Sequence, residues 1–379
     1  MGNKINVVIT ARPSWSRVKS LILNYAELVG PKNISIFLTG PAVSDRYGNI
    51  KSQIPADILV NAFPTLKEGS DFSSITISSL EGGTAACQTW TYNRPDAVLV
   101  IADRVETLGI SLAAASMQIP LIHLQGGEFS GSIDDKIRDA NSKLADLHLT
   151  TNNFTFKNLV AMGELPENIR IVGCPSIDIL KQQINSNTPL HNNASDYGGV
   201  GEDFMTSSPF GIIMFHPDTL NIVESEDWVE NIYKVIERSE MNWFWFWPNP
   251  DFGSDNLSKI LRKKRESSKN FRIRYIINLT PEKFMDLTIK SKIMIGNSSF
   301  GIREASYLGL PVINLGKRQF SRERSQNVLD IDLPRDFLEE LKIHLKSNFK
   351  SSLIYGDGNA GKLASQFLAN WEPKLKLRS

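Results

Sequence analysis

The chain has 379 residues, of which 41% are hydrophobic and 22% are charged, and its formal net charge is +1. At about 100–200 residues per domain, this length predicts two domains, each large enough to bury a core. The near-neutral charge argues against non-specific nucleic-acid binding, which needs a basic face. No apolar run approaches the roughly 20 residues of a membrane span, and an apolar strand begins almost at the first residue instead of a signal peptide. We therefore expect a cytoplasmic protein without a membrane partner.

Cysteine and histidine usage argues against a metal site and a disulfide framework. Cys87 and Cys174 lie far apart and form no CxxC pair, and the five histidines show no ligand spacing. We expect no bound metal.

Short apolar runs recur along the chain, and helical patterns separate many of them. The runs are Ile5–Ile9, Ile34–Leu38, Ala97–Ile101, Leu121–Leu124, Gly211–Phe215, Trp243–Trp247, Ile273–Ile277, Lys292–Ile295 and Val312–Leu315. Uninterrupted apolar strands that alternate with amphipathic helices are typical of a parallel sheet covered on both faces. A polar, Gly-rich stretch from Asn185 to Gly201 divides the runs into two groups and is the expected linker. The pattern predicts two doubly wound α/β domains that face each other across a cleft, with ligands beyond the carboxyl ends of the strands.

The turn after the first strand, Thr10–Arg17, lacks the GxGxxG dinucleotide fingerprint, so NAD is not expected. Arg12 and Ser16 flank a helix start there and are candidates to bind phosphate. The alternative is that Arg12 forms an ordinary surface salt bridge.

Acidic residues follow two neighbouring strands of the first group. Asp103 comes directly after Ala97–Ile101, and Glu128 follows Leu121–Leu124. A right-handed crossover places the carboxyl ends of both strands on one rim of the sheet, where two carboxylates could serve proton removal and delivery. In the alternative reading, Asp103 caps the next helix and Glu128 is a solvated loop residue.

An amphipathic helix is predicted from Gly131 to His148, with apolar positions on one face at Ile133, Ile137, Ala140, Leu144 and Leu147. Its start lies next to Glu128, which makes Asp134 a further candidate acid. The favourable interaction of Asp134 and Asp135 with the helix dipole is a sufficient structural reason for both.

In the second group, His216 follows the strand Gly211–Phe215 and could donate to a diphosphate or act as an acid, although a loop histidine is equally common. Trp243, Trp245 and Trp247 should share one face of the next strand, with Phe244 and Phe246 on the other. Only the segment that starts at Asn249 should approach a ligand.

The stretch Lys292–Gln319 is typical of a strand, a polar turn, a capped helix and a second strand. Ser298, Ser299 and the N–H groups of the helix start form an anion site, to which Arg303 and Arg318 could add charge-assisted contacts. Gly309 should end the helix. The alternative is an ordinary βα unit with a polar turn.

Three long motifs carry a resemblance to a known family: His123–His148 (HLQGGEFSGSIDDKIRDANSKLADLH), Met162–Asp178 and Gly296–Gln319. Together they resemble the UDP-N-acetylglucosamine 2-epimerase family, above all its hydrolysing branch, which serves sialic-acid-type sugar synthesis. The resemblance spans about residues 5–330 and implies the GT-B fold of two Rossmann-like domains. It implies a first domain at residues 1–184, a linker at 185–208, a nucleotide-binding domain at 209–360, and a C-terminal helix at 361–379 that packs back on the first domain.

The resemblance also implies roles for single residues. The catalytic carboxylates would be Asp103 and Asp134. The nucleotide contacts would be Arg12, Ser16, Arg104, His216, Asn249, Ser298, Ser299, Glu304 and Arg318, with Glu304 on the ribose hydroxyls. A carboxylate of the family often stands at the position of Gln125, so either Glu128 takes over its role or the mechanism uses fewer acids.

Similar enzymes expel UDP by anti elimination to a glycal and then add water, with inversion at C2. The implied reaction converts UDP-N-acetylglucosamine, or a related nucleotide-linked 2-acetamido sugar, to a free N-acetylmannosamine-type sugar and UDP, without any cofactor. The alternatives are a non-hydrolysing 2-epimerase, a GT-B glycosyltransferase and a catalytically silent nucleotide-sugar sensor. A homodimer or higher homo-oligomer is expected from the resemblance.

Overall fold

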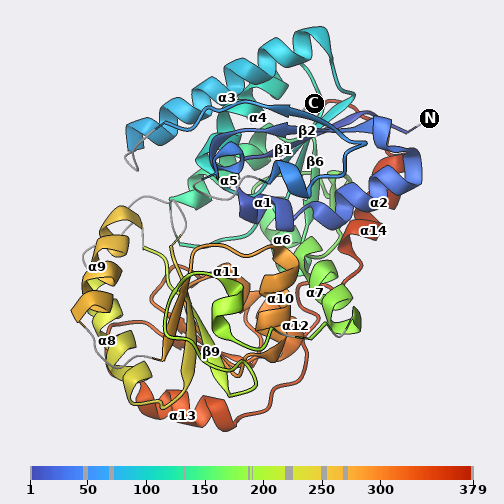
Figure 1. Ribbon diagram of the computed structural model, residues 1–379. Helices are drawn as coiled ribbons and strands as arrows, with labels where there is room; N and C mark the ends of the chain where they lie inside the picture. Colours follow the sequence, from blue (N-terminus) through green and yellow to red (C-terminus); the bar gives the residue numbers. More distant parts are fainter. Residues whose placement is uncertain are drawn as a thin grey trace. The chain divides into compact units, whose positions relative to one another are not determined.

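The computed structural model describes residues 2–45, 50–67, 72–131, 133–186, 188–189, 191–217, 225–248, 254–267 and 272–376. The chain folds as two compact units (Figure 1). Unit 1 comprises Met1–Glu128, Ile133–Asp178 and Tyr355–Ser379, and unit 2 comprises Phe129–Ser132 and Ile179–Ile354. Each unit is built on its own sheet and is considered in turn.

The sheet of unit 1 has seven strands in the order β3-β2-β1-β4-β5-β6-β7, and neighbouring strands pair in parallel. The strands are β1 (Ile5–Ile9), β2 (Ile34–Leu38), β3 (Leu59–Ala62), β4 (Ala97–Ile101), β5 (Leu121–Leu124), β6 (Leu147–Thr150) and β7 (Ile169–Ile171). The strands β1, β4 and β5 are buried along their whole length, as expected of apolar strands covered on both faces.

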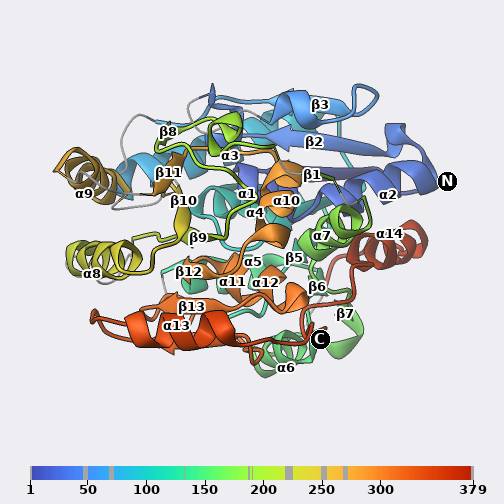
Figure 2. The same ribbon diagram turned by 60° about the horizontal axis from the view of Figure 1, so that its bottom comes forward.

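Helices cover both faces of this sheet (Figure 2). They are α1 (Arg12–Ser16), α2 (Lys19–Val29), α3 (Phe72–Tyr92), α4 (Val105–Ser116), α5 (Asp134–Leu144), α6 (Asn153–Ala161) and α14 (Ala360–Asn370), while α7 (Pro175–Ser186) begins in unit 1 and continues into unit 2. Side chains of α2 and α14 pack with Val7 and Leu99 in one core cluster. Those of α3 and α4 pack with Val8 and Val98 in another. The alternation of β1 and β4 side chains between the two clusters defines the two faces of the sheet.

The C-terminal helix α14 lies against α2 at the other end of the sequence, shown in red and blue in Figure 1. The hydroxyl of Ser365 donates to the carbonyl of Leu21 at 3.0 Å. The carboxylate of Asp178 accepts from the backbone N–H groups of Ala360 at 2.9 Å and Gly361 at 2.6 Å, which are donors left over at a helix start. Helix α14 therefore completes the core of unit 1.

The sheet of unit 2 has the order β14-β13-β12-β9-β10-β11-β8. Its strands are β8 (Val200–Gly201), β9 (Phe210–Met214), β10 (Asn242–Phe246), β11 (Ile273–Ile276), β12 (Met294–Gly296), β13 (Val312–Leu315) and β14 (Val328–Ile331). The pairings are parallel, except that β8 runs antiparallel to β11 at the edge. Read from β11 to β14, the six parallel strands repeat the doubly wound order of unit 1.

The helices of unit 2 are α8 (Ser225–Glu237), α9 (Ser254–Ser267), α10 (Pro281–Lys290), α11 (Ser299–Ile302), α12 (Glu304–Leu308) and α13 (Leu338–Lys346). Short 3-10 turns in the chain are η1 (Pro31–Asn33), η2 (Gly40–Val43), η4 (Lys51–Gln53), η5 (Pro166–Asn168) and η6 (Ala194–Tyr197). Along β10, Trp243 and Trp245 pack in one core cluster and Phe244 and Phe246 in another, so the predicted alternation is confirmed. Gly309 ends α12 with a φ of 64°, as predicted.

The helix predicted over 131–148 is wrong at its carboxyl end. Helix α5 ends at Leu144, and the residues from Leu147 form the buried strand β6 between β5 and β7. The predicted apolar face is wrong as well, because the fully buried residues of α5 are Arg138, Asn141 and Ser142. The side of α5 that packs against the rest of unit 1 is therefore polar, although the spacing of the apolar residues predicted an apolar side.

The polar stretch expected as a linker has structure of its own. The turn η6 and the strand β8 both lie in it, and Ala194 and Tyr197 are buried in a core cluster of unit 2. The short strand β8 pairs with β11 through Val200 and Gly201. The run of small and polar residues therefore forms an edge of the second sheet.

Candidate functional site

Each sheet has one topological switch point. This is a pair of neighbouring strands after which the chain continues toward opposite edges of the sheet. The switch point lies between β1 and β4 in unit 1 and between β9 and β12 in unit 2. Ligands of doubly wound folds bind beyond the carboxyl ends of such strands. The predicted residues Arg12 and Asp103 follow β1 and β4, and His216 and Ser298 follow β9 and β12. The topology therefore gathers the predicted residues at the expected place in each unit.

In unit 1, Asp103 forms an ion pair with Arg138 of α5 and lies 3.9 Å from the guanidinium of Arg17. Arg138 also pairs with Asp135 in the first turn of its own helix, and it donates to the backbone carbonyl of Glu128 at 2.8 Å. One guanidinium thus connects the end of β4, the loop after β5 and the start of α5.

Arg138 is completely buried. Burial alone would lower the pKa of its guanidinium, but the charges of Asp103, Glu128 and Asp135 outweigh burial and raise that pKa above its ordinary value. The sequence reasoning missed this residue. The available signal was an arginine three residues after Asp135 on a predicted helix, a spacing that usually indicates a surface ion pair.

Glu128 and Gln125 are both buried, with exposed fractions of 3% and 1%. The reading of Glu128 as a solvated loop residue is therefore wrong, and the hydroxyl of Thr151 donates to its carboxylate at 3.5 Å. The amide of Gln125 donates to the sulfur of Cys174 at 3.3 Å. In these contacts the two side chains of the loop have different partners, Thr151 for Glu128 and Cys174 for Gln125.

Asp134 occupies the first turn of α5 and is half-buried. Its neighbour Asp135 is the carboxylate that pairs with Arg138. The structure therefore places Asp134 at the expected helix start, but it assigns the contact with the buried arginine to the adjacent acid.

The other predicted residues of unit 1 lie on the same rim. Burial lowers the pKa of Arg12 to about 10, as expected of a cation with reduced access to water. The hydroxyl of Ser16 donates to the carbonyl of Pro13 at 2.9 Å. Arg104 binds the buried carboxylate of Glu106 with two nitrogens, at 3.2 and 2.9 Å. This bidentate pair orients the Arg104 guanidinium.

In unit 2, the ends of β9 and β12 are joined by the side chain of Asn297. Its oxygen accepts from the backbone N–H of His216 at 2.7 Å, and its nitrogen donates to the carbonyl of His216 at 2.8 Å. The backbone carbonyl of Asn297 in turn accepts from Arg318 at 3.3 Å and from Gln319 at 2.9 Å. These contacts hold His216 and Arg318 around the same residue, which the sequence reasoning did not single out.

The serine pair follows directly. Ser298 caps α11 and accepts from the N–H of Phe300 at 3.3 Å, as predicted for a capped helix start. Arg303, which we expected to face a ligand, is buried and donates to the hydroxyl of Ser299 at 3.1 Å. The Arg303 guanidinium therefore binds the side chain of Ser299 in the Ser298–Ser299 turn.

Glu304 is 3% exposed, and its Oε2 atom accepts no hydrogen bond from the described part of the chain, although it lies 3.9 Å from the Nε of Arg303. A carboxylate oxygen in that state favours a donor such as a ligand hydroxyl. The last predicted contact, Asn249, lies outside the residues that the structure describes.

The chain matches the family model of UDP-N-acetylglucosamine 2-epimerase over residues 32–369. It belongs to this family. The resemblance of the three sequence motifs is thereby confirmed.

Two curated relatives show how far the similarity to the epimerases extends. The UDP-N,N'-diacetylbacillosamine 2-epimerase (hydrolyzing) of Legionella pneumophila is 31% identical over 343 residues, which are 89% of this chain and 88% of the relative. The UDP-N-acetylglucosamine 2-epimerase of Neisseria meningitidis is 29% identical over 334 residues, 87% of this chain and 84% of the relative.

Solved epimerase structures share the fold. The UDP-GlcNAc 2-epimerase of Methanocaldococcus jannaschii, crystallised in complex with UDP-GlcNAc and UDP, superposes with a TM-score of 0.79. It is 18% identical, and the match covers 96% of this chain and 99% of that one. With two Rossmann-like parallel-sheet units, this member of the epimerase family has the predicted GT-B fold class.

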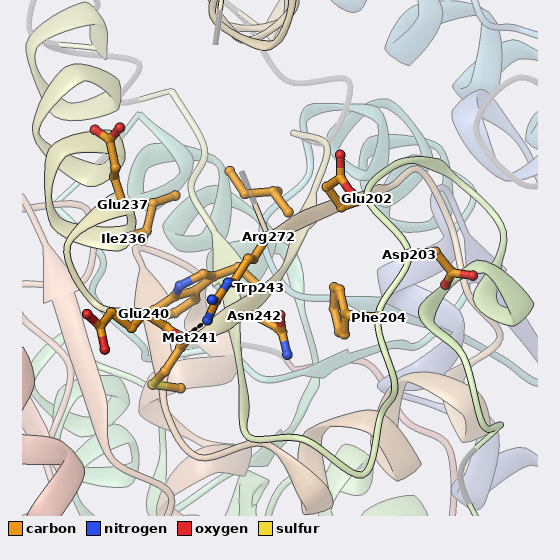
Figure 3. Close-up of a pocket in the computed structure, with 11 residues that line it drawn as sticks. Glu202, Asp203, Phe204, Ile236, Glu237, Glu240, Met241, Asn242, Trp243 and Arg272 are labelled. Carbon is orange, nitrogen blue, oxygen red and sulfur yellow. Dashed lines mark hydrogen bonds between the residues drawn. The ribbon is translucent and has the colours of Figure 1, made fainter. Parts of the chain in front are cut away.

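A pocket of about 560 Å³ in unit 2 lies away from the predicted site residues. Figure 3 shows its lining, in which Asn242 begins β10 and Arg272 precedes β11. It is therefore at the amino ends of these strands, whereas family members with this fold are expected to bind ligands beyond the carboxyl ends.

The described part of the chain contains no group of three or more histidine, cysteine or acidic side chains arranged to hold a metal. Among the same residues, no helix has the length and apolar character needed to cross a membrane.

Proposed function

We propose that this chain is a hydrolysing 2-epimerase. Its substrate would be UDP-N-acetylglucosamine or a related nucleotide-linked 2-acetamido sugar, and its products the free N-acetylmannosamine-type sugar and UDP. The observation that carries the proposal is the buried Arg138, which joins Asp103 to Asp135 and to the backbone of Glu128. The Legionella pneumophila relative, whose name includes the word hydrolyzing, supports the hydrolytic branch.

The reaction needs a base and an acid. Elimination breaks the C2–H and C1–O bonds of the sugar, gives a glycal and releases UDP. Water then adds across the double bond, its oxygen at C1 and a proton at C2 from the opposite face, so that C2 is inverted. We assign the proton transfers to Asp103, Asp134 and Glu128, with His216 as a further acid. Positioned groups of this kind typically contribute about 10²–10⁴ in rate.

Glu128 is the proposed replacement for the missing carboxylate at Gln125. An amide cannot transfer a proton as a carboxylate does, and Glu128 is the carboxylate on the same loop. Glu128 is also buried and interacts electrostatically with Arg138, so it belongs to the same charged cluster as Asp103.

The leaving UDP develops negative charge, which cations and N–H groups stabilise. We propose that Arg12, Ser16, Arg104, His216, Ser298, Ser299 and Arg318 bind the diphosphate and that Asn249 assists them. Glu304 would accept hydrogen bonds from the ribose hydroxyls, since its Oε2 has no donor among the described residues. No cofactor is needed for these steps.

Two parallel incubations test the proposal. The purified protein is mixed with UDP-N-acetylglucosamine, and in parallel with UDP-N,N'-diacetylbacillosamine, in deuterated water, and the products are followed by NMR. Release of UDP together with a free manno-configured sugar that carries deuterium at C2 supports the hydrolytic function. Intact substrates with measurable binding would instead indicate a nucleotide-sugar sensor or another donor.

The second candidate is a non-hydrolysing 2-epimerase. It is favoured by the Neisseria meningitidis relative, whose name does not include hydrolysis. In the same experiment it would return a deuterated UDP-sugar without release of UDP. We further propose a homodimer or higher homo-oligomer, which sedimentation equilibrium at several concentrations can test.

A further inference from the structure

We propose that His123 is a positioning residue that sets the Ala102–Asp103 turn, and through it the carboxylate of Asp103. The inference rests on the proposed function, because that function makes Asp103 an acid–base residue. In this proposal His123 does not contact the substrate and acts only through the Ala102–Asp103 turn.

The contacts of His123 point at this turn. Its side chain is completely buried on β5, the strand beside β4. Its Nε2 lies 2.9 Å from the carbonyl oxygen of Ala102, and its Nδ1 lies 3.0 Å from the hydroxyl of Ser142 on α5. The adjacent Asn141 donates to the same carbonyl at 3.4 Å and to the hydroxyl of Thr107 at 2.8 Å.

These partners determine the tautomer. A carbonyl oxygen can only accept, so Nε2 must carry the hydrogen. Burial lowers the pKa of His123 to about 3, so the ring is neutral and Nδ1 accepts from the Ser142 hydroxyl. The result is a directed chain of hydrogen bonds from α5 through His123 to the residue before Asp103.

The turn needs such support because its backbone is unusual. Ala102 has a φ of 55°, in the left-handed region that residues with a side chain rarely adopt. Conformations of this kind persist where the surrounding structure holds them in place. The carbonyl of Ala102 belongs to the peptide that leads directly into Asp103, so a tilt of this peptide moves the Asp103 carboxylate relative to Arg138.

The loop that carries Gln125 and Glu128 packs closely against His123 and Ser142. A Cβ added to Gly126 would lie 2.8 Å from both the His123 Nδ1 and the Ser142 hydroxyl. A glycine is therefore required where the loop passes the imidazole. His123 thus sits between two of the segments to which we assign acid–base residues.

The test compares two substitutions of nearly equal length. His123→Gln keeps an N–H donor that can reach Ala102, whereas His123→Met fills the space without a donor. We expect His123→Met to lower kcat about 10–100-fold, the scale of a misplaced reacting group, with KM and UDP affinity little changed, and His123→Gln to recover most of kcat. Equal kcat values in the two variants, or a loss confined to KM, would overturn the proposal.

A matched control is His344, a buried histidine of unit 2 whose Nε2 also binds a backbone carbonyl, that of Asn327 at 2.9 Å. His344→Met and His344→Gln should show no difference in kcat from each other. A difference as large as that at His123 would mean that the effect reports general destabilisation and would overturn the positioning role.

Hydrogen–deuterium exchange separates this inference from the proposed function. His123→Met should accelerate exchange of the peptide that covers residues 98–108, and His123→Gln should not, whether or not the wild type turns over a nucleotide sugar. An inactive wild type would therefore refute the proposed function, whereas the exchange results would still test the role of His123. If His123→Met does not fold, Ser142→Ala takes its place, with a smaller fall in kcat and faster exchange expected. Unchanged exchange in that variant would refute the inference.

Discussion

Arg138 shows at the scale of one residue how the fold of unit 1 organises charge. Its guanidinium is 1% exposed and pairs with Asp103 and Asp135, while the backbone of Glu128 accepts from it. A buried ion pair is weak evidence for net stability, but removal of one partner leaves the other charges buried without compensation.

We predict that Arg138→Met lowers the free energy of unfolding by about 3–5 kcal/mol, because it removes the buried cation that Asp103 and Asp135 share, while Arg17 lies farther from Asp103, at 3.9 Å. Urea denaturation of the two proteins measures the difference. Arg238→Met is the matched control, since Arg238 pairs with Asp336 at side-chain exposures of 53% and 51%. That exposed pair should contribute only about 0–1 kcal/mol. Equal effects at both arginines would contradict the assignment of Arg138 as a buried ion.

At the scale of elements, helices α2 and α14 of unit 1 depend on close backbone contact. Gly361 in α14 faces Ser20 in the first turn of α2, and a Cβ at position 361 would lie 2.5–2.7 Å from Ser20 and Leu21 atoms. The helix α14 could not approach this closely with a larger residue at position 361. The contact explains why a helix at the end of the chain belongs to the first unit.

We predict that Gly361→Ala destabilises unit 1 by about 1–3 kcal/mol, the usual range for overpacking. Gly82→Ala in α3 is the control, because its new Cβ would have ordinary contacts at 3.6 Å to the side chains of Ile110 and Thr39. Alanine is the better helix former, so the control should be neutral or stabilising by about 0.5–1 kcal/mol. Thermal unfolding followed by circular dichroism compares the two. A neutral Gly361→Ala would refute the close contact.

At the scale of the whole molecule, buried titratable groups predict acid sensitivity. Burial lowers the pKa of His123 from 6.5 to about 3. Burial of Glu164 opposes its ionisation, but its bonds to His148, Lys376 and Lys143 prevail and lower its pKa from 4.5 to about 2. In both cases the unfolded chain binds protons at a higher pH than the folded chain does, so acidification favours unfolding.

We expect the urea midpoint to fall as the pH drops below 6.5, first through His123 and then, from 4.5 towards 2, through Glu164 as well. His123→Gln should reduce the first part of this fall, and Glu164→Gln the second. Midpoints measured across this pH range check the prediction. A midpoint that stays constant or rises on acidification would contradict the prediction.

The central strands and the fold class followed from sequence, because a strand covered on both faces must be apolar along its length. The predicted runs Ile5–Ile9, Ile34–Leu38, Ala97–Ile101, Leu121–Leu124 and Val312–Leu315 coincide with strands of the structure. Strands such as β3, β8 and β14 escaped the prediction, because these edge strands are more exposed, β3 and β14 carry polar residues, and β8 has only two residues. Strand β6 was misread as the end of a helix because Leu147 continued the helical period.

The site residues divide in the same way. The sequence by itself determined which polar residues follow the strands, since the carboxyl end of a parallel strand is visible as the end of an apolar run. Only the tertiary structure decided which of them are buried and paired. Arg138, His123 and Asn297 form their contacts across elements far apart in the chain, at Asp103, Ala102 and His216. No local pattern encodes such pairs, because whether a charge faces water or another charge depends on the packing of elements that the period of one segment does not reveal.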